Sequence, residues 1–133
     1  MWFYQSRVFV DVPEGVVGFV YIIKNLSNNK QYVGKKLFTK AGYKQVRGKR
    51  KKIRTPSDWM DYYGSNKVLQ EDVKRLGPAN FERRILHLCK TRGQCNYLEA
   101  KEQFMREVLE YPDQFYNEQV RVRVNRSHLK LEG

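Results

Sequence analysis

Two short stretches, Gly18-Phe19-Val20-Tyr21-Ile22-Ile23-Lys24 and Gln31-Tyr32-Val33-Gly34-Lys35-Lys36, decide the fold of this chain. Both are rich in β-branched and aromatic residues, which favour β-strands. The polar run between them contains Asn28-Asn29, and asparagine adopts positive φ more readily than most residues. The pattern predicts a β-hairpin with a tight turn at these two asparagines.

A two-residue turn at this place sets which side chains share a face of the hairpin. Tyr21 would lie opposite Lys36, and Tyr32 would lie opposite Asn25. Opposed residues point to the same face, and faces alternate along each strand. Tyr21, Tyr32 and Lys36 are therefore expected on one face. Two phenols and an ammonium group favour a polar site there, although a tyrosine in a hairpin is more often present for packing.

The composition describes one basic domain. The 133 residues include 26 Lys and Arg against 14 Asp and Glu, which gives a formal net charge of +12. A chain of this size forms a single unit with one core, so residues 1–133 are taken as one domain. The charge favours a polyanionic partner, with nucleic acid first and a membrane surface as the competitor.

Membrane insertion and secretion are not expected. No apolar run approaches the ~18 residues of a membrane-spanning helix, and Met1-Trp2-Phe3-Tyr4 lacks the basic and apolar regions of a signal peptide. Cys89 and Cys95 fit neither a zinc-finger spacing nor a disulfide framework, so free structural thiols are expected. These features predict a soluble cytoplasmic protein that does not bind membranes.

The basic residues concentrate in one segment. Between Lys35 and Arg54 there are ten Lys and Arg and no Asp or Glu. A solvated charge run explains many such segments, but Gly42, Tyr43 and Gly48 interrupt this one, as suits a flexible loop laid along phosphates. The predicted nucleic-acid-binding residues are Lys35, Lys40, Lys44, Arg47, Lys49, Arg50, Lys51 and Lys52, together with Arg121 and Arg123 near the C-terminus.

Periodicity and capping signals predict the other elements. They are strands over 7–12 and 81–88, helices over 57–63, 66–76 and 94–110, and a final strand or basic arm over 120–131. Thr55 is expected to cap the first helix. The order predicts an α+β fold, with a small antiparallel three-stranded core sheet covered by helices and extra N- and C-terminal strands.

The last predicted helix contains a carboxylate in an apolar setting. Leu98, Met105 and Leu109 form a stripe at helical spacing, and Glu102 lies on the same stripe. A carboxylate there is costly unless it is paired, reaches the edge, or binds a metal ion. An edge-lying structural glutamate and a ligand fit the spacing equally well. Mg²⁺ needs only one or two protein carboxylates.

These segments together resemble the GIY-YIG nuclease family. Val20-Tyr21-Ile22 and Tyr32-Val33-Gly34 are similar to the two signatures of that family. Glu102, in the run 99–104, resembles the family's metal-binding glutamate, and Phe115-Tyr116-Asn117 resembles its terminal asparagine motif.

The resemblance covers residues 18–117, which leaves a basic insertion loop at 35–56 and a basic extension at 118–133. Gly34-Lys35-Lys36, Ser57-Asp58-Trp59 and Tyr63-Gly64-Ser65 are similar to small phage-encoded members, whose place of action would be the host cytoplasm.

The resemblance implies metal-dependent hydrolysis of a phosphodiester bond in DNA. A single Mg²⁺ (or Mn²⁺) would be held by Glu102, and Asn117 would fix the backbone around the site. Tyr21 or Tyr32 would position or deprotonate the attacking water. A free tyrosine has a pKa of ~10, so a base needs a nearby cation, and Lys36 would supply it.

One position departs from the family pattern. Asp58 precedes Trp59 where the family carries a catalytic arginine. Lys36 and Arg54 are the candidates to replace that cation. Tyr62 or Tyr63 would take the family position about one turn later.

Two alternatives remain beside a nuclease acting on duplex DNA. A degenerate nuclease fold would bind nucleic acid without cutting it, and an active enzyme would also be able to cut structured DNA or RNA. No separate recognition domain is evident after Asn117, so low or locally determined specificity is expected.

Overall fold

The computed structural model describes residues 1–129 and is built around a five-stranded sheet with the order β2-β1-β7-β3-β4. The strands are β1 (Trp2–Tyr4), β2 (Arg7–Phe9), β3 (Gly18–Asn25), β4 (Gln31–Leu37), β5 (Thr39–Val46), β6 (Lys49–Pro56) and β7 (Phe81–Cys89). The helices are α1 (Lys67–Leu76) and α2 (Arg92–Met105), with short 3₁₀ turns η1 (Trp59–Asp61), η2 (Pro78–Asn80) and η3 (Arg126–Leu129).

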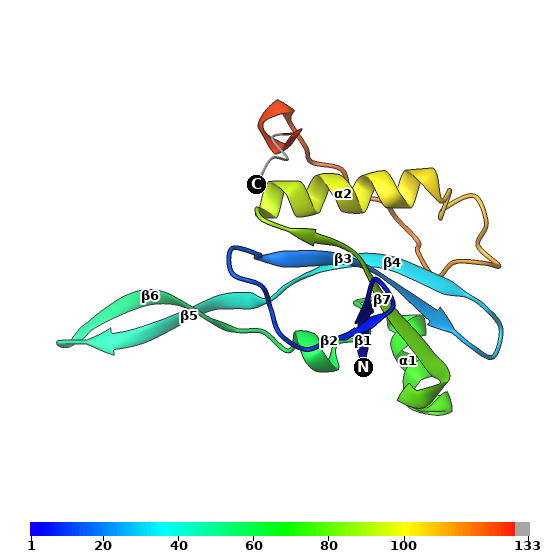
Figure 1. Cartoon of the computed structure of the whole chain (residues 1–133), viewed down its shortest axis with the longest axis horizontal. Helices are drawn as coiled ribbons and strands as arrows, with labels where there is room; N and C mark the ends of the chain where they lie inside the picture. The colour runs from blue at the N-terminus through cyan, green and yellow to red at the C-terminus, as the bar shows by residue number, and fades with distance from the viewer. Residues whose placement is uncertain (130–133) are drawn as a thin grey trace.

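The two faces of the sheet carry separate cores, because side chains alternate along the central strand β3. Val20 and Ile22 point toward α2, where they pack with Val33 and the free thiols Cys89 and Cys95. The predicted free thiols are thus confirmed. Figure 1 shows α2 above the sheet and α1 below it.

The opposite face holds an aromatic core. Phe19 and Tyr21 of β3 pack there with Trp2, Phe38 and Trp59. The Trp2 and Phe19 ring centroids lie 4.9 Å apart in an edge arrangement, and the Trp2 indole N–H donates to the Trp59 carbonyl over 2.8 Å. The face that was expected to be polar is therefore largely apolar, with its polar groups at the margin.

The sheet is larger than predicted. Strands β7, β3 and β4 pair antiparallel, but β1 adds to β7 in parallel, and β2 pairs with β1. Trp2 drives this addition, since its side chain is 2% exposed within the aromatic core. The α+β class is confirmed, whereas a sheet of three antiparallel strands is not.

Two helix predictions need correction. The segment from 57 to 63 forms only η1, because Thr55 and Pro56 end β6 instead of starting a helix. Helix α2 ends at Met105, five residues before the predicted end, and Met105 and Leu109 are 68% and 47% exposed. The predicted apolar stripe is wrong.

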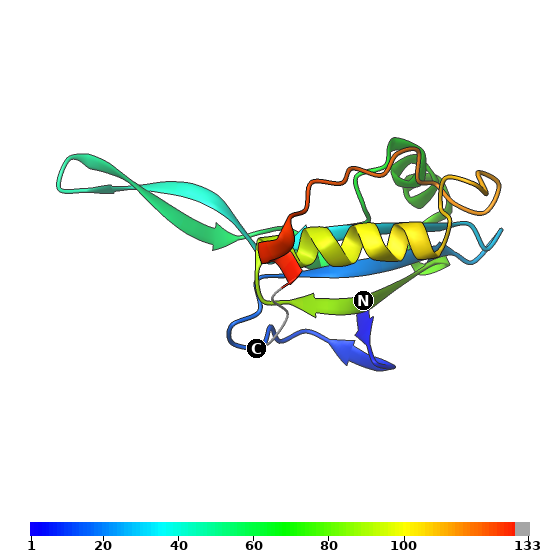
Figure 2. The ribbon, with the colours of Figure 1, turned by 90° about the horizontal axis from the view of Figure 1, so that it is seen from above.

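The basic segment is a hairpin and not a flexible loop. β5 and β6 pair antiparallel from Thr39–Pro56 to Val46–Lys49. Arg47 and Gly48 at the tip have φ values of 51° and 77°, as a two-residue type I′ turn requires. Figures 1 and 2 show this hairpin standing away from the rest of the molecule.

The C-terminal segment returns alongside α2 (Figure 2). Within its described part, 118–129, the chain forms η3 and no strand, and residues 130 and 131 of the predicted element lie outside the described range. Among residues 1–129, no helix has the length and apolar character needed to cross a membrane.

Candidate active site

The register of the β3–β4 hairpin determines which groups reach the site. Tyr21 pairs with Gly34, and Tyr32 pairs with Ile23. The pairing predicted from a turn at Asn28-Asn29 is wrong by two residues, because the loop holds four residues and closes at an Asn25 N–H to Lys30 carbonyl bond of 2.9 Å. An even shift preserves the faces, so Tyr21, Tyr32 and Lys36 do share one face.

Gly34 opens a path for the Tyr21 hydroxyl. A Cβ at this position would lie 2.5 Å from Tyr21 Oη and 2.8 Å from Cζ. Since β4 is an edge strand of the sheet, the phenol reaches over Gly34 to the sheet margin. The Tyr21 ring remains buried, with only 1% of its surface exposed.

At this margin the chain forms a cavity of about 600 Å³, named here the tyrosine cavity. Strands β3 and β4, helix α2 and the C-terminal segment all contribute to it. Its lining residues are Tyr21, Tyr32, Lys35, Ser65, Asn96, Glu99, Gln103, Gln119, Arg121 and Arg123. One carboxylate, two phenols and three cations therefore meet in one concave site.

Glu99 is the carboxylate of the tyrosine cavity. It lies one helical turn from both Cys95 and Gln103, which are buried against the sheet, so its side chain faces the same way. Glu102 lies elsewhere on α2, with its carboxylate 3.3 Å from His87 Nε2 and 3.4 Å from Arg106 Nε. The structure does not place Glu102 with the two tyrosines.

Burial is the main cause of the pKa shifts of the acidic groups that line this cavity. Burial raises the pKa of Glu99 above the ordinary glutamate value, and the Lys35 ammonium opposes that rise. Burial also raises the pKa of Tyr21 well above 10.0. The pKa of Tyr32 is raised for the same reason, although its 3.0 Å hydrogen bond with Ser65 acts against the shift. Both phenols therefore stay protonated at neutral pH.

The two cations proposed from sequence lie beside the cavity and not in it. Lys36 Nζ is 2.7 Å from Asp58 and 4.0 Å from the ring centroid of Tyr62. Arg54 is held by Thr39, with 3.1 Å from its Nε to Thr39 Oγ1 and 2.7 Å from Nη2 to the carbonyl. Both line a second cavity of about 390 Å³, named here the basic groove.

Of the two tyrosines proposed for the later position, Tyr62 is the one near Tyr21. Their ring centroids are 6.0 Å apart in an edge arrangement. Tyr63 instead stacks on the Arg83 guanidinium at 4.1 Å. Arg83 also donates to the carbonyls of Met60 and Tyr62 over 3.0 and 2.9 Å, which fixes the segment that carries Tyr62.

Asn117 fixes the strand that carries Tyr32 and Gly34. Its amide accepts from the Val33 N–H over 3.0 Å and donates to the Val33 carbonyl over 2.8 Å. Gln103 donates to the same carbonyl over 2.9 Å. Because an edge strand has one unpaired side, these two amides take the place of a neighbouring strand at Val33.

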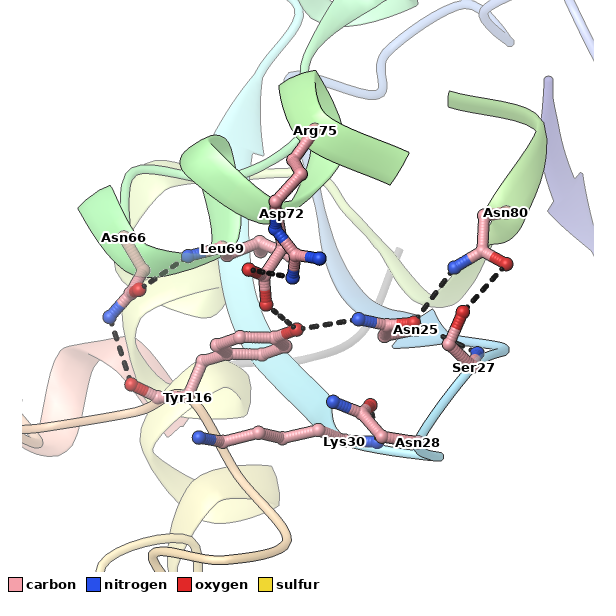
Figure 3. Close-up of polar contacts among 10 residues, drawn as sticks. All are labelled: Asn25, Ser27, Asn28, Lys30, Asn66, Leu69, Asp72, Arg75, Asn80 and Tyr116. Carbon is pink, nitrogen blue, oxygen red and sulfur yellow. Dashed lines mark hydrogen bonds and ion pairs between the residues drawn. The ribbon is translucent and has the colours of Figure 1, made fainter. Parts of the chain in front are cut away.

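A polar network around Tyr116 ties the chain that follows α2 to α1 and to the end of β3 (Figure 3). The Tyr116 hydroxyl donates to Asp72 over 2.7 Å and accepts from Asn25 over 2.9 Å. Asn66, which caps α1, donates to the Tyr116 carbonyl over 2.8 Å. This network holds Asn117, the next residue, in place against β4.

A match to a family model identifies the family of this chain. The family model described as "Putative endonuclease segE, GIY-YIG domain" matches residues 2–120. The chain belongs to the GIY-YIG nuclease family. Comparison with curated proteins and with solved structures gave no match. As a GIY-YIG endonuclease domain, the chain acts on nucleic acid.

The oxygen atoms that line the tyrosine cavity fit a hard divalent cation. Among residues 1–129, no group of three His, Cys, Asp or Glu side chains gathers into a metal cluster. Mg²⁺, however, keeps most of its waters and takes one or two carboxylates with substrate phosphate oxygens. Glu99 supplies one such carboxylate. A bound cation would offset the desolvation cost of the charged carboxylate, which is what raises the pKa of Glu99.

Glu99 was not predicted from the sequence, because the wrong face of the last helix was taken as the buried one. The stripe of Leu98, Met105 and Leu109 placed Glu99 off the core face. Cys95 and Gln103, four residues before and after Glu99, were the signal that could have found it. Asn96, Gln119 and Ser65 were also missed, and their sequence context carries no comparable signal.

Proposed function

We propose that this protein is a divalent-metal-dependent endonuclease of duplex DNA whose reaction takes place in the tyrosine cavity. The observation that carries the proposal is the meeting of Tyr21, Tyr32 and Glu99 in one cavity with three cations. These groups come from separate segments of the chain. Gathering polar and charged groups in one cavity contributes little to stability, because burying them costs free energy, so a functional reason accounts for it better.

Glu99 is the residue that would hold Mg²⁺ or Mn²⁺. A bound divalent cation supplies Lewis-acid stabilisation to the phosphoryl oxygens. Lys35 lies next to this carboxylate and favours its ionised form, because the ammonium offsets part of the desolvation cost. Lys35 itself is held by a hydrogen bond to Asn96 on α2.

Tyr21 and Tyr32 orient the attacking water as hydrogen-bonding phenols. Their raised pKa values oppose the role of general base, which would need phenolate. In the hydrolysis, the water oxygen forms a new bond to phosphorus while one ester P–O bond breaks. The attacking water loses one proton to solvent, and the leaving oxygen takes up one from solvent to become a hydroxyl. The phenols hold the water on the side opposite the leaving oxygen.

Arg121 and Arg123 are the candidates for the cation that the family carries on its first helix. Both line the tyrosine cavity, and a guanidinium matches two phosphate oxygens at once. Lys36 and Arg54 line the basic groove. There they would contact phosphates next to the scissile one and contribute to binding more than to turnover.

The test compares plasmid nicking in Mg²⁺ by wild type, Glu99→Gln and Glu102→Gln. We expect Glu99→Gln to lower the rate by at least about 100-fold, the usual order for loss of a preorganised charge. Glu102→Gln is the matched control on the same helix and should stay within a few-fold of wild type. The reverse pattern would overturn the assignment of Glu99.

The same assay separates the cations. Arg121→Ala and Arg123→Ala, made singly, should lower turnover in at least one case while DNA binding persists. If Lys36→Ala or Arg54→Ala does so instead, the cation acts from the basic groove. Binding to duplex DNA with no cleavage in Mg²⁺ or Mn²⁺ would make the chain a binding module, and preferential cleavage of RNA or branched DNA would change the substrate.

A further inference from the structure

The hairpin β5–β6, residues 39–56, is named here the ribbon, and the reaction centre does not explain it. It carries eight Lys and Arg and no Asp or Glu. Nearly all of its residues are exposed, and within residues 1–129 its strands pair only with each other. A two-stranded ribbon is marginally stable alone, and Lys44 directly opposite Lys51 adds repulsion. Such a charge distribution is suited to a polyanion.

The two faces of the ribbon differ in chemistry. In the observed register one face carries Lys40, Lys44, Lys49 and Lys51 as its charged groups. The other face carries Tyr43, Gln45, Arg50, Lys52 and Arg54. Lysine ammonium groups act as point charges on phosphates. Arg presents two parallel donors and Gln presents a donor beside an acceptor, and both arrangements can read base edges.

One readout group of the second face, Arg50, is already oriented by a contact within the ribbon. The Arg50 guanidinium lies 3.8 Å from the ring centroid of Tyr43. Gln45 is directly opposite Arg50 across the ribbon. The stacking already restricts the conformations of the Arg50 side chain. Arg50 therefore loses less conformational entropy when it binds, which favours a defined contact.

The ribbon is continuous with the reaction centre. The basic groove begins at Lys35 and Asn96, which also line the tyrosine cavity, and reaches Lys40 and Arg54 at the base of the ribbon. Eight residues per strand at ~3.3 Å each extend about 26 Å. That length corresponds to roughly eight base-pair steps of ~3.4 Å.

We propose that the ribbon enters the major groove of duplex DNA beside the cut, with its Arg and Gln face toward the base edges. The inference rests on the proposed function for its substrate. The major groove of B-DNA is about 12 Å wide and admits a two-stranded ribbon, whereas that of A-form RNA is too narrow to be read. The ribbon thereby gives a local preference within about eight base pairs on one side of the cut.

The test selects preferred duplexes from a randomised DNA library, using the full chain in EDTA so that cleavage plays no part. We expect wild type to enrich a short motif. Replacing the purines of that motif by 7-deazapurines, which lack the major-groove N7 acceptor, should weaken binding about 10-fold. Replacing guanine by inosine, which alters the minor groove, should have little effect.

Two matched double variants distinguish reading from charge. Gln45→Ala/Arg50→Lys keeps every positive charge and should lose the motif preference while the salt dependence stays unchanged. Lys44→Gln/Lys51→Gln should keep the motif, weaken all sequences alike, and reduce the slope of log K against log salt by about 2.

Absence of an enriched motif, or a motif indifferent to 7-deazapurines, would overturn groove reading. An unchanged motif in Gln45→Ala/Arg50→Lys would overturn the assignment of the face. These outcomes are independent of plasmid cleavage in Mg²⁺, so failure of the ribbon inference and failure of the proposed function are distinguishable.

Discussion

At Gly34, the absence of one methyl group decides whether Tyr21 can reach the tyrosine cavity. The ring of Tyr21 packs in the aromatic core, while its hydroxyl passes over the backbone of the edge strand. Glu99 is constrained by its position as well, because burial close to the sheet desolvates its carboxylate and raises its pKa. The desolvated carboxylate of Glu99 lowers stability in favour of a polar site, as functional residues often do.

Gly34→Ala should displace the Tyr21 phenol and lower nicking strongly. Overpacking of this kind costs about 1–3 kcal/mol of unfolding free energy, which urea denaturation can measure. Because the closest contact is with Tyr21 Oη, the cost should shrink in a Tyr21→Phe background. An equal cost in both backgrounds would mean that the clash is with the Tyr21 ring and not with its hydroxyl.

Glu99→Gln should raise the free energy of unfolding at neutral pH by about 1 kcal/mol, in the range of single stabilising substitutions. Burial raises the pKa of Glu99 in the folded state above its unfolded value. Folding therefore favours the protonated acid, and this contribution is lost as pH rises through the folded pKa. The gain from Glu99→Gln should be larger at pH 8 than at pH 4.

Glu102→Gln is the control for that measurement, since it removes the same charge from the same helix. It breaks the contacts with His87 and Arg106 and should not stabilise the protein. A stability gain in Glu102→Gln but not in Glu99→Gln would contradict the electrostatic description of the tyrosine cavity.

At the scale of elements, the exposed edge of β4 is completed by side chains. Asn117 and Gln103 bond the backbone of Val33, and Gln31 forms a parallel bridge with Phe115. The C-terminal segment thus serves as a short substitute for a sixth strand. It also leaves the neighbouring stretch around Gly34 open for the cavity.

Tyr116→Phe should loosen this substitute strand. It removes a hydrogen bond to the Asp72 carboxylate and leaves the buried Asn25 amide without one of its acceptors. The expected loss is about 1.5–3 kcal/mol, measured by urea denaturation. Tyr111→Phe, at a 45% exposed tyrosine, is the control and should be near neutral.

The effect of Tyr116→Phe should depend on pH. The hydrogen bond from Tyr116 lowers the pKa of Asp72 below its ordinary value. The stability that this bond contributes is present above the unfolded pKa and disappears as pH falls through the folded pKa. The stability difference between wild type and Tyr116→Phe should therefore narrow in strongly acidic solution to the part that comes from Asn25. A constant difference across pH would show that the carboxylate form is not involved.

At the scale of the whole molecule, the chain divides into a body, which holds both cores and the tyrosine cavity, and the ribbon, which extends away from it (Figure 1). The ribbon residues from 39 to 56 are absent from the buried clusters on both faces of the sheet. Folding of the body and contact with DNA should therefore be separable.

Replacing residues 41–54 by Asn-Gly should leave a folded body that binds DNA poorly. The change in unfolding free energy should be within about 1 kcal/mol, since shortening a surface hairpin alters loop entropy little. Seven basic residues are lost, so the salt slope of DNA binding should fall by up to about 6. Calorimetry and salt titration measure the two effects, and an unfolded product would contradict the division.

Local patterns in the sequence determined the elements with strong periodicity or clear caps. The strands predicted at 18–24, 31–36 and 81–88 and the helix predicted at 66–76 are all formed, with bounds that differ by one residue. The tyrosine face of the hairpin was also predictable, because side-chain alternation survives a two-residue change in register. The family followed from the order of these motifs.

Only the tertiary structure decided how these elements meet. The addition of β1 to the sheet depends on a distant partner for Trp2. The presence of Glu99, and not Glu102, in the tyrosine cavity depends on which side of α2 faces β4. Arg121 and Arg123 reach the cavity because the C-terminal segment turns back along α2. The physical reason is that the periodicity of a sequence identifies the apolar face of a single element. The position of a polar cavity depends instead on how several elements, distant in the sequence, pack against one another.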